Sequence, residues 1–151
     1  MLTQELLQRF KPHKDNILQI LHALQNAHPE HYLTDEAMRN VAKYLNISLS
    51  SVYGVATYYT MFSVKPRGKY IIRVCQSPVC RMLKSSVIFD TLKGVLNVEI
   101  GETTGDKLFT LEVTECLGRC GDAVSMMINE SYYGNLTPEL VKEIIQMYKN
   151  K

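Results

Sequence analysis

The chain has 151 residues, of which 46% are hydrophobic and 21% charged, and its formal net charge is +2. A chain of this length buries roughly 68–70% of its unfolded surface on folding, so it needs no disulfide to form a stable core. The composition is that of a globular protein rather than a disordered or fibrous one. The small net charge provides no strong field for nucleic acid or an anionic membrane.

The N-terminal stretch MLTQELLQRFKPHKDN has neither a long apolar run nor a small-residue cleavage site. We therefore expect no secretory signal and a cytoplasmic location. Residues 44–64 include no Asp, Glu, Lys or Arg, but their serines and threonines make the segment too polar to span a bilayer. We expect this segment to be buried in the protein and expect no direct insertion into a membrane.

In the first part of the chain, apolar residues recur at helical spacing in three segments. The first runs from Ile17 to a stop at His28, where a proline follows. The second lies between an N-cap at Thr34 and Asn46, and the third begins after an N-cap at Ser48. A Pro-Arg-Gly stretch then marks a boundary. We predict an N-terminal helical domain over residues 1–66.

From residue 69 on, strands and helices alternate. The runs KYIIRV and LFTLEVTE predict strands, and RMLKSSVIFDTLKGVL between them predicts one helix. AVSMMI and SYYG predict a hairpin turning at Asn129, and LTPELVKEIIQMYK predicts a final helix with Thr137 as N-cap and Pro138 at its first position. The residues expected to supply apolar contacts in the first of these helices are Leu83, Val87, Phe89 and Leu92. The fold class is α/β (α+β), with a domain of helices over a small sheet at residues 67–151.

The four cysteines form two close pairs, Cys75 with Cys80 in CQSPVC and Cys116 with Cys120 in CLGRCG. Each pair directly follows a predicted strand, so one site at one type of strand end can gather all four thiols. In the reducing cytosol, clustered cysteines more often bind metal or do redox work than form structural disulfides. The pattern therefore predicts a metal site.

The spacing favours one kind of metal site. Structural zinc sites favour gaps of two residues between cysteines, whereas these gaps are four and three. A 2Fe-2S cluster has two irons that each take two thiolates, which matches two pairs. Ligation by histidine is disfavoured because all four histidines precede the first cysteine. Thiol–disulfide exchange is disfavoured because no C-x-x-C motif is present. A zinc-stabilised interaction module remains an alternative.

Four neighbours of the cysteines are candidates for supporting such a site. Gly118 and Gly121 free the second loop for positive φ and for close approach of its amides. Arg81 and Arg119 are candidates for positive charge near the sulfurs, and the helix after the first pair is expected to point backbone N–H groups at the sulfur of Cys80.

The chain has no dinucleotide or phosphate loop, no triad and no carboxylate pair, so we expect no catalytic residue on it. A metal cluster without a substrate pocket transfers electrons, which predicts one subunit of a larger assembly. The stretch EAMRNVAKYLNISLSSVYGVATYY is similar to a helix-turn-helix, so an iron-sulfur-sensing DNA-binding regulator is a second alternative. Its candidate recognition helix contains no Lys or Arg, and nucleic acid is therefore not an expected partner.

The segments CQSPVC, LFTLEVTECLGRCGDA, MMINESYYGNLTPE and VYGVATYYTMF together closely resemble the thioredoxin-like 2Fe-2S subunit of NADH:quinone oxidoreductase (respiratory complex I). The same module occurs in NAD(P)-linked hydrogenases, including electron-bifurcating ones, and in NAD-dependent formate dehydrogenases. The resemblance implies a thioredoxin-like domain in which one 2Fe-2S cluster is bound by Cys75, Cys80, Cys116 and Cys120. It also implies a non-catalytic electron-transfer subunit of an NAD(P)-dependent oxidoreductase complex.

The resemblance further implies partners. A separate flavoprotein subunit is expected to carry FMN and the NAD(P)H site, beside further iron-sulfur subunits. The short C-terminus favours the soluble hydrogenase or formate dehydrogenase type over complex I. Candidates for facing the flavoprotein are Tyr53, Tyr58, Tyr59 and Phe62. One position departs from the family, which often has Ala-Pro after the last cysteine, since here Val124 follows Ala123.

Overall fold

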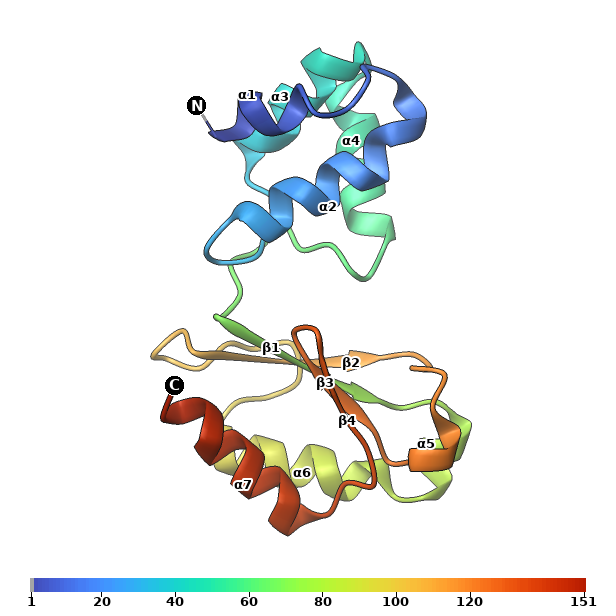
Figure 1. Cartoon of the computed structure of the whole chain (residues 1–151), viewed down its shortest axis with the longest axis vertical. Helices are drawn as coiled ribbons and strands as arrows, with labels where there is room; N and C mark the ends of the chain where they lie inside the picture. Colours follow the sequence, from blue (N-terminus) through green and yellow to red (C-terminus); the bar gives the residue numbers. More distant parts are fainter. Residues whose placement is uncertain (1) are drawn as a thin grey trace. The chain divides into compact units, whose positions relative to one another are not determined.

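The structure is a computed structural model that describes residues 2–151, with side chains from residue 4 onward. By their internal contacts the residues group into two compact units, Met1–Arg67 (unit 1) and Gly68–Lys151 (unit 2). Figure 1 shows helices in the first unit and a sheet with helices in the second. In the described part of the chain, no helix is both long and apolar enough to cross a membrane.

Unit 1 consists of helices α1 (Leu2–Leu7), α2 (Ile17–Ala27), α3 (Asp35–Leu45) and α4 (Leu49–Tyr58), with a 3-10 turn at Lys14–Asn16. Local capping defines two of the starts. The Thr34 hydroxyl accepts a hydrogen bond from the Ala37 amide, and the Ser48 hydroxyl accepts one from the Ser51 amide, both at 3.1 Å. The three predicted helices are confirmed, and α1 is an additional helix too short to show a periodic pattern.

The apolar stripes of these helices form the core of unit 1, and the polar side chain of Gln25 is buried with them. Gln25 donates from its amide nitrogen to the Met61 carbonyl at 2.9 Å and accepts from the Ser63 amide at 2.8 Å. This pair of bonds anchors the chain after α4 to α2, and it satisfies a polar group that would otherwise be costly to bury.

The prediction that residues 44–64 are buried is wrong for most of the segment. The buried members are Leu45, Val52, Ala56 and Phe62. By contrast, Tyr53 is 50% exposed and Tyr58 is 79% exposed. Helix α4 packs only one stripe against unit 1, so the absence of charge did not imply burial.

Unit 2 contains a four-stranded sheet of β1 (Tyr70–Cys75), β2 (Phe109–Thr114), β3 (Met126–Ile128) and β4 (Ser131–Tyr133), in the order β2-β1-β3-β4. Strands β1 and β2 are parallel, and the other two pairs are antiparallel. The hairpin predicted at Asn129 is confirmed, with that residue in the left-handed conformation at φ 50. Both predicted longer strands are also confirmed.

Three helices complete unit 2: α5 (Pro78–Met82), α6 (Ser85–Leu96) and α7 (Pro138–Lys149). Figure 1 shows α6 and α7 side by side on one face of the sheet. Their buried side chains join those of β1, β2 and β3 in a single core. The predicted cap of α7 is confirmed, because the Thr137 hydroxyl accepts from the Leu140 amide at 3.2 Å.

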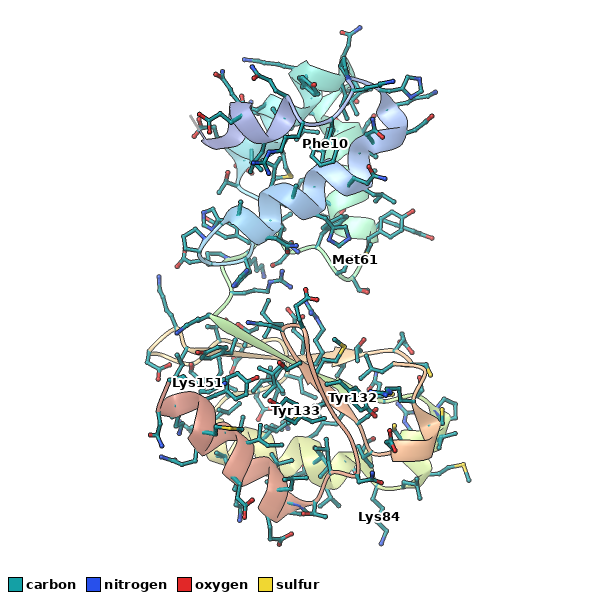
Figure 2. The ribbon with its side chains drawn as sticks, in the orientation of Figure 1. Phe10, Met61, Lys84, Tyr132, Tyr133 and Lys151 are labelled. Atoms are coloured by element: carbon teal, nitrogen blue, oxygen red, sulfur yellow. The ribbon has the colours of Figure 1, made fainter. Side chains whose placement is uncertain are left out.

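The single helix predicted after Cys80 is wrong in one respect. Lys84, labelled in Figure 2, has a left-handed φ of 65 and separates α5 from α6. Phe89 and Leu92 are buried as expected, whereas Leu83, before the break, is 55% exposed. Val87 is 42% exposed because it lies off the buried face of α6, which Ile88, Phe89 and Leu92 form. A left-handed residue changes the direction of the chain, and a periodicity count across it fails.

Apolar and polar residues alternate along β2, but burial does not follow this alternation at two positions. Val113 is 38% exposed, and Thr110 is buried. The Thr110 hydroxyl accepts a hydrogen bond from the Gly68 amide at 2.6 Å and lies 2.9 Å from the Thr103 hydroxyl, so its burial is satisfied. A polar residue is therefore tolerated at this core position because both neighbours supply partners.

Candidate metal centre

The two cysteine loops leave the sheet at the same end. Strands β1 and β2 run parallel, with Cys75 opposite Thr114 in the register. Cys75 is the last residue of β1, and Cys116 follows two residues after the end of β2. Both loops therefore leave the sheet at its carboxyl-terminal edge, which is where the strand pattern predicted that they would meet.

The first pair lies inside the core. Cys75 and Cys80 are 2% and 3% exposed, and both belong to the core of unit 2. Helix α5 positions Cys80, beginning at Pro78 after an extended Ser77. Proline is favoured at a first helical position because its missing N–H has no partner to lose there.

The second pair lies at the surface, where both Cys116 and Cys120 are exposed. Gly118 adopts φ 75, and its amide donates to the sulfur of Cys116 at 3.2 Å. A side chain at this left-handed position would be strained, so glycine is required for the turn. Cys120 starts a 3-10 turn that ends at Asp122.

Backbone amides from both loops converge on the first pair. The sulfur of Cys75 accepts hydrogen bonds from the amides of Ser77 and of Leu117, which belongs to the second loop. The sulfur of Cys80 accepts one from the amide of Ser125, just before β3. We expected amides of the following helix to point at the sulfur of Cys80, but the donor is the amide of Ser125, from a distant segment. The Cys75 sulfur therefore interacts with backbone amides of both cysteine loops.

These contacts set the ionisation of the thiols. Burial raises the pKa of Cys75, but the amide hydrogen bonds from Ser77 and Leu117 outweigh it and hold the pKa below its ordinary value. Burial and the neighbouring Cys75 keep the pKa of Cys80 above its ordinary value. The pKa of Cys120 is raised because its thiol donates a hydrogen bond to the sulfur of Cys116 and because negative charge on that sulfur favours the protonated form. Cys75 is therefore poised to act as an anionic ligand.

The donor set divides two by two. Cys75 contributes to the raised pKa of Cys80, and Cys116 and Cys75 both contribute to the raised pKa of Cys120. Among residues 2–151, no three or more His, Cys, Asp or Glu side chains are grouped so as to hold one ion. Two pairs of thiols supply the two thiolates that each iron of a 2Fe-2S cluster takes.

The four supporting candidates differ in placement. Gly118 has the predicted positive φ, whereas Gly121 lies in the 3-10 turn without one. Arg81 is exposed beside an open hollow of about 500 Å³ that is also lined by Gln76 and Glu115. The guanidinium of Arg119 lies over the ring of Tyr132, 4.2 Å from its centre.

Leu117, Ser125 and Tyr132 were not among the candidates predicted from the sequence. Ser125 is 1% exposed, and its carbonyl also accepts from the Cys75 amide at 3.0 Å. A serine within the apolar run AVSMMI was a usable signal, because a buried hydroxyl needs partners. The contacts of Leu117 and Tyr132 depend on how distant segments come together, and no local pattern marks them.

Comparison with known proteins places the chain. A profile of the thioredoxin-like [2Fe-2S] ferredoxin family matches residues 3–149. The chain belongs to this family. The resemblance and the fold class expected from the sequence are thereby confirmed, including the thioredoxin-like domain. Membership supports an iron-sulfur cluster on the chain. At the position where the family often has Ala-Pro, the Ala123–Val124 peptide bond is cis.

Relatives belong to two kinds of enzyme. The NADP-reducing hydrogenase subunit HndA of Solidesulfovibrio fructosivorans is 35% identical over 91% of this chain and 80% of its own length. An NADH-quinone oxidoreductase subunit of Mycobacterium tuberculosis is 33% identical over 97% of this chain, which spans 58% of that protein.

A solved structure supports the fold. The crystal structure of an NAD+-reducing [NiFe]-hydrogenase in its H2-reduced state matches 90% of this chain and 22% of the hydrogenase chain, with a TM-score of 0.79. The sequence identity is 18%, so this likeness concerns the fold alone.

Proposed function

We propose that this chain is an electron-transfer subunit that carries one 2Fe-2S cluster on Cys75, Cys80, Cys116 and Cys120. The observation that supports this most directly is that both cysteine loops leave parallel strands at the same end, with Cys75 of β1 opposite Thr114 of β2. Such a cluster supplies a one-electron redox couple.

The protein would bind the cluster, shield it from water and polarise the cysteine sulfurs. The core excludes water from the first pair, and the amides of Ser77, Leu117, Gly118 and Ser125 donate to three of the four sulfurs. Amide donors stabilise negative charge on sulfur, and they do so more strongly when the site gains an electron. Exposure of the second pair leaves one side of the site open to a partner.

The proposed setting is a multisubunit NAD(P)H-linked flavin oxidoreductase in the cytoplasm. FMN and NAD(P) would be bound by a flavoprotein partner, with further iron-sulfur subunits beside it. The two kinds of relative support either a soluble hydrogenase or an NADH-quinone oxidoreductase, and a formate dehydrogenase remains within the proposal. We favour the soluble type.

Exposed aromatic side chains on α4 are proposed to contact the flavoprotein. Tyr53, Tyr58 and Tyr59 are exposed by 50%, 79% and 36%. Phe62 was a fourth candidate, but it is 7% exposed and its ring packs against His22, 4.7 Å between centres. It therefore contributes to the core of unit 1 instead.

The test is anaerobic reconstitution of the full chain with iron and sulfide. We expect two irons and two sulfides per chain, a red-brown colour, and an electron paramagnetic resonance signal only after reduction. Replacing any one of the four cysteines by serine should lower the cluster content or change the spectrum. A chain that takes up zinc stoichiometrically and remains colourless under these conditions would overturn the proposal.

A further inference from the structure

Strand β4 presents two tyrosines to opposite faces of the sheet. Tyr133 pairs with the buried Met126, and its hydroxyl lies 3.0 Å from that of Tyr148 on α7. Tyr132 pairs with Met127, so alternation directs its side chain to the face that α6 and α7 do not cover. Both tyrosines are labelled in Figure 2. Tyr132 is therefore not used by the core.

The ring of Tyr132 contacts the second cysteine loop instead. The guanidinium of Arg119, the residue directly before Cys120, lies 4.2 Å from the ring centre. A cation over an aromatic face is attracted by the ring quadrupole, and arginine also stacks through its flat surface. This contact joins the loop between Cys116 and Cys120 to the edge strand of the sheet.

Two backbone hydrogen bonds extend the same junction. The Asn135 amide donates to the Asp122 carbonyl at 2.7 Å, and the Leu136 amide donates to the Val124 carbonyl at 3.0 Å. The segment after β4 is thus bonded to the segment after Cys120. The turn that carries the last cysteine is flanked by a ring contact on one side and these bonds on the other.

Gly134 lets the two segments approach closely. A Cβ atom at this position would lie 2.7 Å from the Asp122 Cβ, 2.9 Å from the Asp122 carbonyl oxygen and 2.8 Å from the Tyr132 hydroxyl. Real Cβ contacts are not this short, so any side chain here would displace the turn, the tyrosine or both. The packing of the junction depends on glycine.

The hydroxyl of Tyr132 adds no hydrogen bond to the junction. Within the described residues, it is a buried side-chain oxygen without a hydrogen-bond partner. Its ring, rather than its hydroxyl, makes the contact with Arg119. Phenylalanine should therefore substitute for it, whereas an aliphatic side chain should not.

We propose that Tyr132 is a positioning residue for the second cysteine loop, because its ring holds Arg119 and thereby fixes the turn that carries Cys120. The proposal rests on the proposed function only in so far as the loop supplies two of the four cluster ligands. Strand β4 then positions the second cysteine pair, whereas core packing positions the first pair. It also gives Arg119 a fixed place beside the site, where its positive charge favours the reduced state.

The test compares six variants of the full chain after reconstitution, namely five single variants and the double variant of Tyr132→Leu with Arg119→Met. Tyr132→Leu removes the ring, Arg119→Met removes the charge, and Tyr132→Phe and Arg119→Lys are the conservative versions. Lys151→Met is the matched control, since it removes another cation over a ring in unit 2, that of Tyr148, outside both cysteine loops. Circular dichroism verifies that each variant is folded.

We expect Tyr132→Leu and Arg119→Met each to lose the cluster to a chelator about 2- to 5-fold faster than the parent. The double variant should be no faster than either single one, because both remove the same contact. Arg119→Met should lower the midpoint potential, and Tyr132→Leu should change the line shape of the reduced spectrum. Tyr132→Phe and Lys151→Met should match the parent, and Arg119→Lys should keep its potential.

A second measurement does not need the cluster. In the metal-free chain, Tyr132→Leu should raise hydrogen exchange at the Asn135 and Leu136 amides about 2- to 5-fold, and Tyr132→Phe should not. If these amides exchange faster but the parent binds no cluster, the proposed function fails and the positioning contact stands. If the parent binds the cluster but Tyr132→Leu matches it in exchange, cluster loss and spectrum, the inference is overturned.

Discussion

The two cysteine loops hold equivalent places after parallel strands, yet different forces position them. Cys75 and Cys80 are 2% and 3% exposed within the core of unit 2, whereas Cys116 and Cys120 are exposed. The first pair is positioned by apolar packing. The second is positioned by surface contacts, namely the turn at Gly118 and the ring beneath Arg119.

The order of the strands explains this difference. Strand β1 lies between β2 and β3, so the chain leaving it is covered on both sides. Strand β2 is at the edge of the sheet, and the chain leaving it has a neighbour on one side only. Two loops with the same local relation to a strand can therefore differ in burial, because burial depends on what lies beside the strand.

The largest expected effect on stability concerns two valines that precede the two cysteine loops. Val74 on β1 is opposite Val113 on β2. Val74 is fully buried and Val113 is 38% exposed. Val74→Ala should lower the free energy of unfolding by about 2–3 kcal/mol through lost burial and a cavity. Val113→Ala should change it by about 0.5 kcal/mol or less. Urea denaturation measures both, and equal costs would contradict the comparison.

The next effect concerns two glycines near the second loop. Gly134→Ala should destabilise the chain by about 1–3 kcal/mol, because its Cβ would overlap Asp122 and Tyr132. Gly121 has open space around its Cβ position and no positive φ, so Gly121→Ala should be nearly neutral. Thermal unfolding of the metal-free chain distinguishes them. A neutral Gly134→Ala would show that the junction with β4 is loose.

A third pair of variants removes one thiol from each loop of the reduced, metal-free chain. Cys75→Ala should cost about 1–2 kcal/mol, because it leaves the Ser77 and Leu117 amides without their acceptor. Cys116→Ala should cost about 0.5 kcal/mol or less, because water can reach the Gly118 amide that it frees. Denaturation midpoints at constant slope provide the measurement. A larger loss of unfolding free energy for Cys116→Ala than for Cys75→Ala would contradict the view that the first pair is the one held by the core.

The smallest effect compares the two arginines that adjoin the second cysteine of each pair. Arg119→Met should cost about 0.5–1 kcal/mol, the usual strength of an exposed cation over a ring. Arg81 is exposed, and its side chain makes no hydrogen bond or ion pair with any described residue, so Arg81→Met should change stability by about 0.5 kcal/mol or less. Indistinguishable variants would mean that the ring contact contributes nothing to the loop.

Local signals in the sequence were reliable where the physics is local. The caps at Thr34, Ser48 and Thr137 depend on a hydroxyl and an amide three residues apart, and all three are present. The same kind of inference failed at Lys84, where a left-handed residue that no pattern marks divides one predicted helix into two. Helical periodicity describes a face only as far as the helix continues.

The sequence by itself determined helices α2, α3, α4 and α7, the two longer strands, the hairpin and the four thiols in two pairs, because spacing, capping and turn residues act within a few positions of one another. The strand order decided which pair is buried, and the approach of distant segments decided which amides serve the thiols. Leu117 and Ser125 reach the first pair, and Tyr132 reaches Arg119, only because the sheet brings their segments to one edge. Such contacts follow from the packing of the whole unit, which no short stretch of residues specifies.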